Sequence, residues 1–384
     1  MFWINFLHFY QPPSMGKETI DEVTKRSYFF IIKILKESRK AKIVANINAS
    51  LLEHLEEWGY HQLIFDIYKL AQKGKIELTL SAAYHPVLPL VPYKEAIRQI
   101  KISQKIYKRF FPQIKIKGFF FPEMVYDKKV AQFLPHLGIK WIILDEISLK
   151  GQLNQVNYEK KYIDQNSGLN IVFRSRKFSN GYPPKIVLDF LKESQEKEPV
   201  IISATDAELY GDRHVDREGD FYWALRSRKI KPCLVNQYLK SLKKEEKVVP
   251  YVSSWDTQEN ELKKGESLFL WQNPKNKIHK KLWELTNFAL KTVEKNRKDK
   301  NYKWARLRLD RGLSSCVYWW ASDKKVGSWG SPAWHPDQVI IGAKDLVRSV
   351  RSLEKLPLKQ RLKAEKLYLE INKLVWEKHW KKRN

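Results

Sequence analysis

The chain has 384 residues, of which 43% are hydrophobic and 13% aromatic, so it can bury a large core and is not intrinsically disordered. Lysine and arginine number 71 against 43 aspartates and glutamates, a formal net charge of +28. The lysines are nevertheless spread along the chain without a DNA- or RNA-binding motif, and the two cysteines, Cys233 and Cys316, exclude a disulfide framework and have no metal-type spacing.

The first two thirds of the chain alternate strands with helices. Amphipathic periodicity predicts helices in residues 20–38 and 94–111, among others. Apolar runs predict strands at residues 3–7, 43–47, 76–80, 116–121, 141–144, 171–173, 200–204 and 248–252. This alternation favours an α/β fold with parallel strands, as a barrel or as an open sheet.

The pattern changes from about Asn276 onward. Residues 277–298, 302–320, 337–356 and 358–380 read as successive amphipathic helices. We therefore expect an α/β domain in residues 1–260 and a helical domain in residues 261–384, packed on the rim formed by the strand ends.

The N-terminal segment "MFWINFLHFYQPP" lacks the basic and apolar regions of a signal peptide. No apolar run approaches the ~18 residues that are needed to cross a bilayer. The sequence therefore predicts a soluble cytoplasmic protein, and it leaves loose contacts of the basic surface with acidic polymers or membrane surfaces open.

Ionisable and polar side chains gather where four of the predicted strands end. In parallel α/β folds, functional residues lie at the carboxyl ends of the strands, so these side chains are candidates for one shared site. They are His8, Gln11, Glu77, His85, Glu123, Asp206 and Glu208.

Each candidate also has an ordinary structural interpretation. His8 can be a hydrogen-bonded core residue, Glu123 can precede a helix, and Asp206 can cap a turn. Together, however, two carboxylates at the ends of two different strands, amid many aromatic residues, suit a glycosidase. In such an enzyme one carboxylate attacks the anomeric carbon and the other donates a proton to the leaving oxygen.

Five short motifs make this interpretation more specific. They are "HFYQP" at residues 8–12, "GKIELTLSAAYHPVLPL" at 74–90, "FFPE" at 120–123, "DAELYG" at 206–211 and "CVYWWASD" at 316–323. In this order they resemble the motifs of glycoside hydrolase family 57, which comprises retaining α-glucan enzymes such as α-amylases, 4-α-glucanotransferases and branching enzymes. The resemblance extends from residue 2 to about residue 337.

The resemblance implies a distorted, incomplete (β/α)7 barrel of TIM type followed by a helical region. It implies that Glu123 is the nucleophile and Asp206 the general acid/base, that Phe119, Phe120 and Phe121 form a wall beside Glu123, and that no catalytic metal or cofactor is needed. It assigns substrate binding to His8, Tyr10, Gln11, Glu77, His85, Phe120, Glu208, Trp320 and Asp323. The implied partner is an α-glucan or oligosaccharide substrate.

Two positions depart from the family pattern. Tyr10 stands where the first motif has its second histidine, and it can donate a hydrogen bond but cannot carry a positive charge. Phe120 replaces the more usual tryptophan before Pro-Glu. These changes, together with the short chain, affect the expected substrate more than the chemistry.

Two other functions remain open from the sequence. One is a metal-dependent sugar hydrolase or deacetylase in which His8, His85 and Asp206 bind zinc. The other is a non-catalytic glucan-binding protein on the same scaffold, although the presence of both carboxylates argues against it. The sequence also leaves open hydrolysis, transfer or branching, the linkage preference and the oligomeric state.

Overall fold

The computed structural model describes residues 1–193, 199–326 and 333–381. The chain divides into two compact units. The first comprises Met1–Gln11, Met15–Ala83 and Leu88–Trp255, and the second comprises Pro12–Ser14, Tyr84–Val87 and Asp256–Asn384. Our expectation of two continuous domains, 1–260 and 261–384, does not include the two short segments that belong to the second unit, and it stays a proposal.

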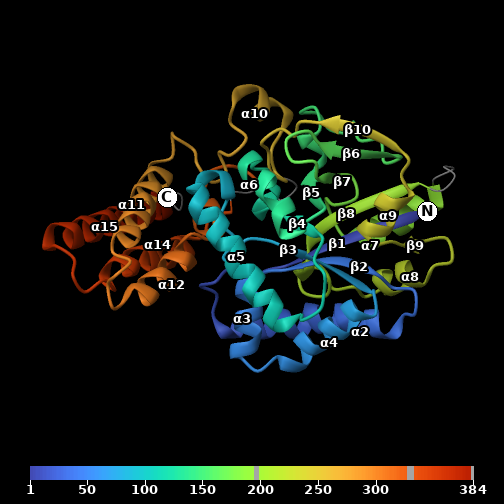
Figure 1. Cartoon of the computed structure of the whole chain (residues 1–384), viewed down its shortest axis with the longest axis horizontal. Coiled ribbons are helices and arrows are strands. Elements are labelled where there is room, and N and C mark those ends of the chain that lie inside the picture. Colours follow the sequence, from blue (N-terminus) through green and yellow to red (C-terminus); the bar gives the residue numbers. More distant parts are fainter. Residues whose placement is uncertain (194–198, 327–332, 382–384) are drawn as a thin grey trace. The chain divides into compact units, whose positions relative to one another are not determined.

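The first unit is built on one ten-stranded sheet, shown in Figure 1. The strands are β1 (Phe2–Phe9), β2 (Ile43–Ile47), β3 (Ile76–Leu80), β4 (Gly118–Phe120), β5 (Trp141–Asp145), β6 (Lys160–Asp164), β7 (Asn170–Arg174), β8 (Val200–Asp206), β9 (Lys231–Pro232) and β10 (Lys244–Val248). Their order is β10-β6-β7-β5-β4-β3-β2-β1-β8, with β9 paired to β1. All of these pairs are parallel except β6–β7.

Seven of the parallel strands curl into a barrel. They run from β8 through β1, β2, β3, β4 and β5 to β7, and β7 then returns to β8. Two hydrogen bonds join the end of β7 to β8: the Ser175 amide donates to the Ile202 carbonyl at 2.8 Å, and Arg174 Nη1 donates to the Ala204 carbonyl at 2.9 Å. This is the predicted α/β fold with a distorted, incomplete (β/α)7 barrel.

Helices connect most of the successive strands of the sheet. They are α1 (Lys17–Val23), α2 (Phe29–Glu37), α3 (Ala49–Glu57), α4 (His61–Gln72), α5 (Tyr93–Phe110), α6 (Lys128–Phe133), α7 (Pro183–Glu193), α8 (Asp220–Arg226) and α9 (Val235–Ser241). A π-helical turn at Thr24–Tyr28 joins α1 to α2 in one continuous helical segment, which ends at Glu37, one residue before the end of the helix predicted at residues 20–38.

The barrel interior is filled by alternate residues of its strands, as the two-residue period of a strand requires. Ile4 and Phe6 of β1 belong to the same buried cluster as Phe120 of β4. The Phe6 and Phe120 rings lie 5.4 Å apart although β2 and β3 separate their strands, so these side chains meet across the interior. A Cβ at Gly118 would lie only 2.2 Å from the Trp141 ring, and glycine therefore makes room for this buried indole.

The segment after β9 covers the amino-terminal end of the barrel. Cys233, Leu234, Val235, Tyr238 and Leu239 extend the interior cluster there, and the Cys233 amide donates to the Trp3 carbonyl near the start of β1. Cys233 and Cys316 are both buried free cysteines. Within the described ranges, no helix is long and apolar enough to span a membrane.

Two strand predictions were wrong. A strand was expected at residues 248–252, but β10 spans Lys244–Val248 and shares only Val248 with that range. The strand β6 (Lys160–Asp164) was not predicted at all. The sequence of β10, "KEEKV", is mostly charged and exposed, because β10 lies at an edge of the sheet. Charged edge strands are typical of proteins that avoid edge-to-edge aggregation, and such strands lack the apolar signal used for prediction.

The second unit is helical. Its helices are α10 (Glu259–Lys264), α11 (Lys277–Lys295), α12 (Tyr302–Gly312), α13 (Ser315–Trp319), α14 (Pro336–Arg351) and α15 (Leu358–Lys381). Helix α14 packs against α11, α12, α13 and α15, which confirms the predicted helical region (Figure 1). The helix expected at residues 302–320 is broken at Leu313–Ser314 into α12 and α13.

Candidate active site

His8 lies at the carboxyl end of β1, between Asn46 of β2 and Asp206 of β8 in the sheet register. Its Nδ1 is 3.0 Å from Asn46 Oδ1. Asn46 Nδ2 donates to the Thr79 carbonyl at 3.0 Å, so the amide oxygen faces His8 and Nδ1 of His8 carries the proton. Burial lowers the pKa of His8 to about 4, against the opposing effects of the Asp206 charge and the Asn46 hydrogen bond. At neutral pH, His8 is therefore an uncharged imidazole.

Aromatic rings surround His8 at this end of the barrel. Its ring lies 4.6 Å from the Phe120 ring and is stacked on Tyr10 at 5.3 Å. Phe119 and Phe121, one residue on either side of Phe120, contact each other edge to face at 5.0 Å. Because side chains alternate along a strand, only Phe120 shares the inner face with His8, and the predicted wall of three phenylalanines is reduced to one.

Glu123 lies in a tight turn directly after β4. Its backbone is left-handed, with φ 58° and ψ 17°, and Met124 follows with φ 57°. Such a conformation costs a non-glycine residue about 1–2 kcal/mol and is found preferentially at functional sites. The turn is held by the Met124 and Val125 amides, which donate to the Phe121 and Pro122 carbonyls at 2.8 and 3.1 Å.

Trp255 reaches Glu123 from the end of the first unit. Trp255 Nε1 donates to Glu123 Oε2 at 2.7 Å, and its backbone amide lies 3.4 Å from the Glu123 carbonyl oxygen. This hydrogen bond orients a carboxylate that is only 9% exposed. This contact could not be predicted from the sequence, because 132 residues separate its partners.

A buried ion triplet holds Trp255 in place. Asp145, at the end of β5, accepts from Arg174 Nε at 2.7 Å and from Arg176 Nε at 2.8 Å, and its side chain is fully buried. Arg174 Nη2 in turn donates to the Trp255 carbonyl at 3.1 Å. The end of β7 therefore supports the residue that contacts Glu123.

Asp206 and Glu208 form a second acidic group at the end of β8. Arg213 Nη1 donates to Asp206 Oδ2 at 3.0 Å, while its Nη2 lies 3.3 Å from Glu208 Oε2. Gln11 Nε2 donates to Glu208 Oε1 at 2.5 Å. Burial raises the pKa of Glu208 to about 8; Arg213 lowers it and Asp206 raises it further. Glu208 is thus largely protonated at neutral pH, whereas the Asp206 side chain is about half exposed.

His8 links the two acidic groups. Its ring packs on Phe120, three residues before Glu123, and its register partner on β8 is Asp206. The carboxyl ends of β1, β4 and β8 therefore contribute to one polar, aromatic-lined region. A nucleophilic carboxylate, a proton-donating carboxyl group and a neutral imidazole for sugar hydroxyls are the groups that glycosyl transfer uses.

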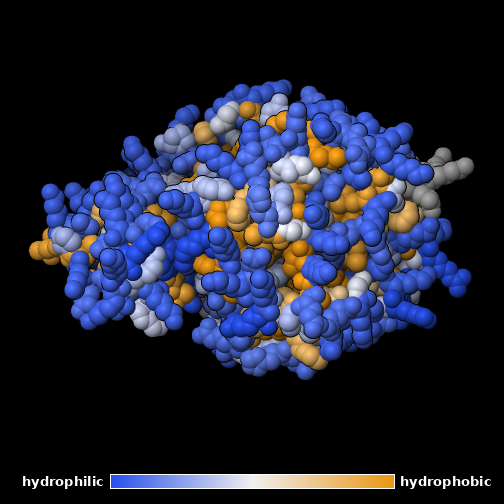
Figure 2. Space-filling view, viewed as in Figure 1, coloured by the Kyte–Doolittle hydropathy of each residue, from blue (hydrophilic) through white to orange (hydrophobic). Residues whose placement is uncertain are grey.

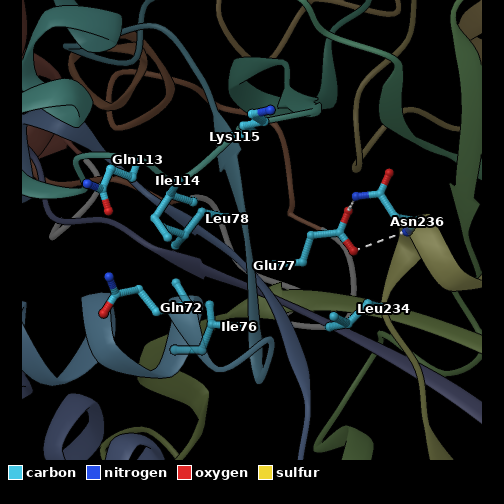
Figure 3. A pocket seen from close by; sticks show the side chains of 10 residues that line it. Gln72, Ile76, Glu77, Leu78, Gln113, Ile114, Lys115, Leu234 and Asn236 are labelled. Atoms are coloured by element: carbon cyan, nitrogen blue, oxygen red, sulfur yellow. Dashed lines mark hydrogen bonds between the residues drawn. The ribbon is translucent and has the colours of Figure 1, made fainter.

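Glu77 does not join this group. It is the second residue of β3. In the sheet register it lies beside Val44 of β2, and Val44 lies beside Phe6 of β1, two residues before His8. Its carboxylate accepts from Trp141 Nε1 at 3.1 Å, from the Asn236 amide at 3.1 Å and from Asn236 Nδ2. Figure 3 shows it pointing toward Asn236 beside a 510 Å³ pocket that Gln72, Gln113 and Lys115 also line.

Glu77 is thus bound at the amino-terminal end of the barrel, below the apolar layer that contains Phe6 and Phe120. This place does not fit the predicted contact with sugar beside His8. Burial raises the pKa of Glu77 to about 7, although the hydrogen bonds from Asn236 and Trp141 oppose that effect.

The remaining predicted residues belong to the second unit. His85 also has a left-handed backbone, with φ 56°, and its Nδ1 lies 3.0 Å from Ser315 Oγ. Asp323 accepts from Lys378 Nζ at 2.5 Å and from Asn276 Nδ2 at 3.1 Å. Trp320 follows α13, and its ring lies 6.3 Å from the Trp319 ring.

We next looked for side chains that could bind a metal ion in residues 1–193, 199–326 and 333–381. No three His, Cys, Asp or Glu side chains of these ranges form a group that could hold a metal ion.

Comparison with known proteins identifies the family. The sequence profile of glycosyl hydrolase family 57 matches residues 4–252, which contain most of β1, the strands β2 to β10 and the acidic groups described above. The chain belongs to glycosyl hydrolase family 57. The family is retaining and its enzymes act on α-glucans, as the motif resemblance predicted.

Two curated relatives illustrate the range of activities. The chain is 26% identical over 173 residues to an α-amylase of Pyrococcus horikoshii, a match covering 44% of this chain and 27% of the relative. It is 26% identical over 146 residues to a 4-α-glucanotransferase of Thermococcus litoralis, covering 37% of this chain and 22% of the relative. The matches thus span about a quarter of the length of these curated relatives.

Solved structures of the family share the fold. The 4-α-glucanotransferase of Thermococcus litoralis superposes with a TM-score of 0.71 at 18% identity, over 92% of this chain and 60% of that one. A branching enzyme of Thermococcus kodakaraensis gives a TM-score of 0.67 at 15% identity, over 95% and 94% of the two chains. At these identities, the similarity establishes the fold alone.

Proposed function

We propose that this protein is a retaining glycosidase or transglycosylase that acts on α-glucans such as maltooligosaccharides, starch or glycogen. In this proposal Glu123 is the nucleophile and Asp206 the general acid/base. Family membership supports the reaction class, and the arrangement of the two carboxylates supports the roles.

The observation that carries the proposal is the turn after β4. The chain holds Glu123 in left-handed backbone geometry, buries it and gives it a hydrogen bond from Trp255. A carboxylate that only ended a strand would need none of these. Asp206 is in contrast about half exposed, which suits a group that must exchange protons with an incoming water or sugar hydroxyl.

The proposed reaction has two steps. Glu123 attacks the anomeric carbon while the glycosidic C–O bond breaks and the proton of Asp206 passes to the leaving oxygen. Asp206 then removes a proton from water or from a sugar hydroxyl, whose oxygen displaces Glu123 from the anomeric carbon. Two inversions give net retention.

We propose that His8, Tyr10, Gln11, Phe120 and Glu208 bind or shape the sugar subsite beside Glu123. A neutral His8 is suited to a sugar hydroxyl, since its Nδ1 proton is donated to Asn46 and its Nε2 can accept a hydrogen bond. His85, Trp320 and Asp323 of the second unit remain proposed sugar-binding residues. We omit Glu77, because its carboxylate is bound to Asn236 and Trp141.

The roles of the two carboxylates can be separated with substrates of different leaving groups. Glu123→Gln removes the nucleophile, so turnover should be lost on both maltooligosaccharides and glycosyl fluorides. Asp206→Asn removes the proton donor, which a fluoride needs little. With a glycosyl fluoride, Asp206→Asn should still form the covalent adduct on Glu123, and this adduct should accumulate. With maltooligosaccharides, its rate should fall about 10²–10⁴-fold.

Equal losses on both substrates in Asp206→Asn, with no adduct detected by mass spectrometry, would show that the roles are assigned wrongly. Binding of glucan by the unmodified protein without any turnover would favour the non-catalytic alternative. Chromatography and NMR of the products from maltoheptaose separate hydrolysis (shorter sugars only), transfer (longer sugars) and branching (α-1,6 signals).

A further inference from the structure

One arginine joins the two acidic residues at the end of β8. Arg213 Nη1 donates to Asp206 Oδ2 at 3.0 Å, and Nη2 lies 3.3 Å from Glu208 Oε2. A guanidinium group is planar and holds its donors in a fixed fork, so contact through both terminal nitrogens fixes the two carboxyl groups relative to each other. The motif "DAELYG" ends two residues before Arg213 and did not draw attention to it.

The surroundings of this trio limit the charges that can act on it. His8 of β1 is neutral at pH 7, and Gln11, two residues after β1, is uncharged and donates to Glu208. From the π-helical turn comes the buried Tyr28, whose hydroxyl lies 3.5 Å from Glu208 Oε1 and whose pKa is raised, so it too is uncharged. Among the described residues, the charges that most shift the pKa of Glu208 are those of Arg213 and Asp206.

We propose that Arg213 and Glu208 are positioning residues for Asp206: the guanidinium ties both carboxyl groups into one unit that orients Asp206 and sets the pH at which the unit releases its proton. This inference rests on the proposed function of Asp206 as general acid/base.

The charges of the trio explain how the unit works. Two carboxylates close together repel each other, and one guanidinium compensates only one of them, so a single proton stays on the unit. The pKa of Glu208, raised to about 8 by burial, makes Glu208 the holder of that proton in the resting protein. A general acid must begin the reaction protonated, so the proton that Glu208 holds in the resting protein has to pass to Asp206 before the leaving oxygen can accept it.

The first test measures Glu208 directly by ¹³C NMR of its carboxyl carbon as a function of pH, with Glu208→Gln identifying the signal. Arg213→Gln removes the cation that lowers the pKa of Glu208, so the midpoint should rise, by about one unit or more. Asp206→Asn removes the anion that raises it, so the midpoint should fall. Arg217→Gln, an equal charge change at an exposed residue of the same loop, should leave it unchanged.

The second test is the pH profile of kcat/KM on a maltooligosaccharide. The basic limb should move to higher pH in Arg213→Gln, which removes a positive charge. It should move to lower pH in Glu208→Gln, which removes the carboxyl group whose deprotonation adds a negative charge to the unit. At the optimum, Arg213→Gln should lower kcat about tenfold or more with little change in KM, because a mispositioned acid affects the transition state more than binding. Arg213→Lys should restore the position of the limb but only part of kcat, since lysine supplies the charge without the fork.

Superimposable profiles and an unchanged Glu208 midpoint in folded Arg213→Gln would overturn the proposal. If Arg213→Gln does not fold, the proposal is decided by the titration midpoint of Glu208 in Asp206→Asn and by the pH profile of kcat/KM in Arg213→Lys. Failure of the proposed function looks different: Asp206→Asn would then keep full activity on maltooligosaccharides, whatever Arg213 does to the titration of Glu208.

Discussion

The indole N–H of Trp255 is the donor that the structure places on the carboxylate of Glu123. Hydrogen bonds to charged groups contribute about 1.5–3 kcal/mol, so this one is strong enough to hold the carboxylate in one orientation. The orientation matters because a nucleophile must approach the anomeric carbon along a defined line.

Trp255→Phe keeps a large aromatic side chain but removes the N–H. We expect kcat to fall about 10–100-fold, which corresponds to the loss of one hydrogen bond to a charged group. Steady-state kinetics on a maltooligosaccharide will measure this. The matched control is Trp223→Phe, at an exposed tryptophan of α8, which should keep full kcat. Equal kcat in the two variants would mean that the indole only fills space.

Glu77, at the amino-terminal end of the barrel, makes the free energy of unfolding depend on pH. Its folded pKa is raised from 4.5 to about 7, so the folded state holds an extra proton between these values. Stability from this group is therefore full below pH 4.5 and is lost as the pH rises through 7, by an amount of about 2–3 kcal/mol.

Glu77→Gln cannot titrate, so its free energy of unfolding should improve relative to the parent protein between pH 5 and pH 8. Urea unfolding at several pH values gives the difference directly. The exposed Glu159→Gln serves as the control and should show no such trend. A parallel pH course for Glu77→Gln and the parent would contradict the raised pKa.

Sequence reasoning led to the candidate site because most of the proposed residues follow the ends of parallel strands. His8, Glu123 and Asp206 come within a few residues of strands whose apolar runs are clear, and the bounds of β2 and β3 were predicted to the residue. Trp255 and Arg213 could not be found this way, because their roles depend on contacts made in three dimensions. The motif around Glu77 does not reveal at which end of β3 its carboxylate is bound, so the contacts with Asn236 and Trp141 could not be predicted.

At the level of elements, the ends of β5, β7 and β8 are joined by charge rather than by a complete ladder of backbone hydrogen bonds. Asp145 binds both Arg174 and Arg176 with its side chain fully buried, and Arg174 continues to the Ala204 carbonyl of β8. A buried carboxylate with two guanidinium partners is costly to break, since its removal leaves uncompensated charge.

Asp145→Asn should therefore destabilise the protein by about 3–5 kcal/mol. The control is Glu245→Gln, which breaks the Lys161–Glu245 pair between β6 and β10, where the glutamate side chain is 52% exposed; it should cost at most about 1 kcal/mol. Chemical denaturation of the two variants provides the comparison. Similar losses in both would show that the triplet does not close the barrel.

Charge is the dominant property of the whole molecule. The net charge of +28 is spread over the surface, and Figure 2 shows a face on which hydrophilic residues predominate between smaller hydrophobic patches. Excess charge of one sign destabilises the compact state through self-repulsion. Salt weakens this repulsion, because the Debye length falls from about 30 Å at 0.01 M to about 8 Å at 0.15 M.

We therefore expect the thermal midpoint at pH 7 to rise when NaCl is increased from about 0.01 M to about 0.15 M. Exposed ion pairs are screened as well, but each contributes only about 0–1 kcal/mol, so the loss of repulsion should prevail. The internal control is the same series near pH 9.7, the isoelectric point, where the net charge vanishes and the salt effect should be much smaller. Differential scanning calorimetry will measure both series. A midpoint that falls with salt at pH 7, or that rises equally at both pH values, would show that net repulsion does not limit the stability of this protein.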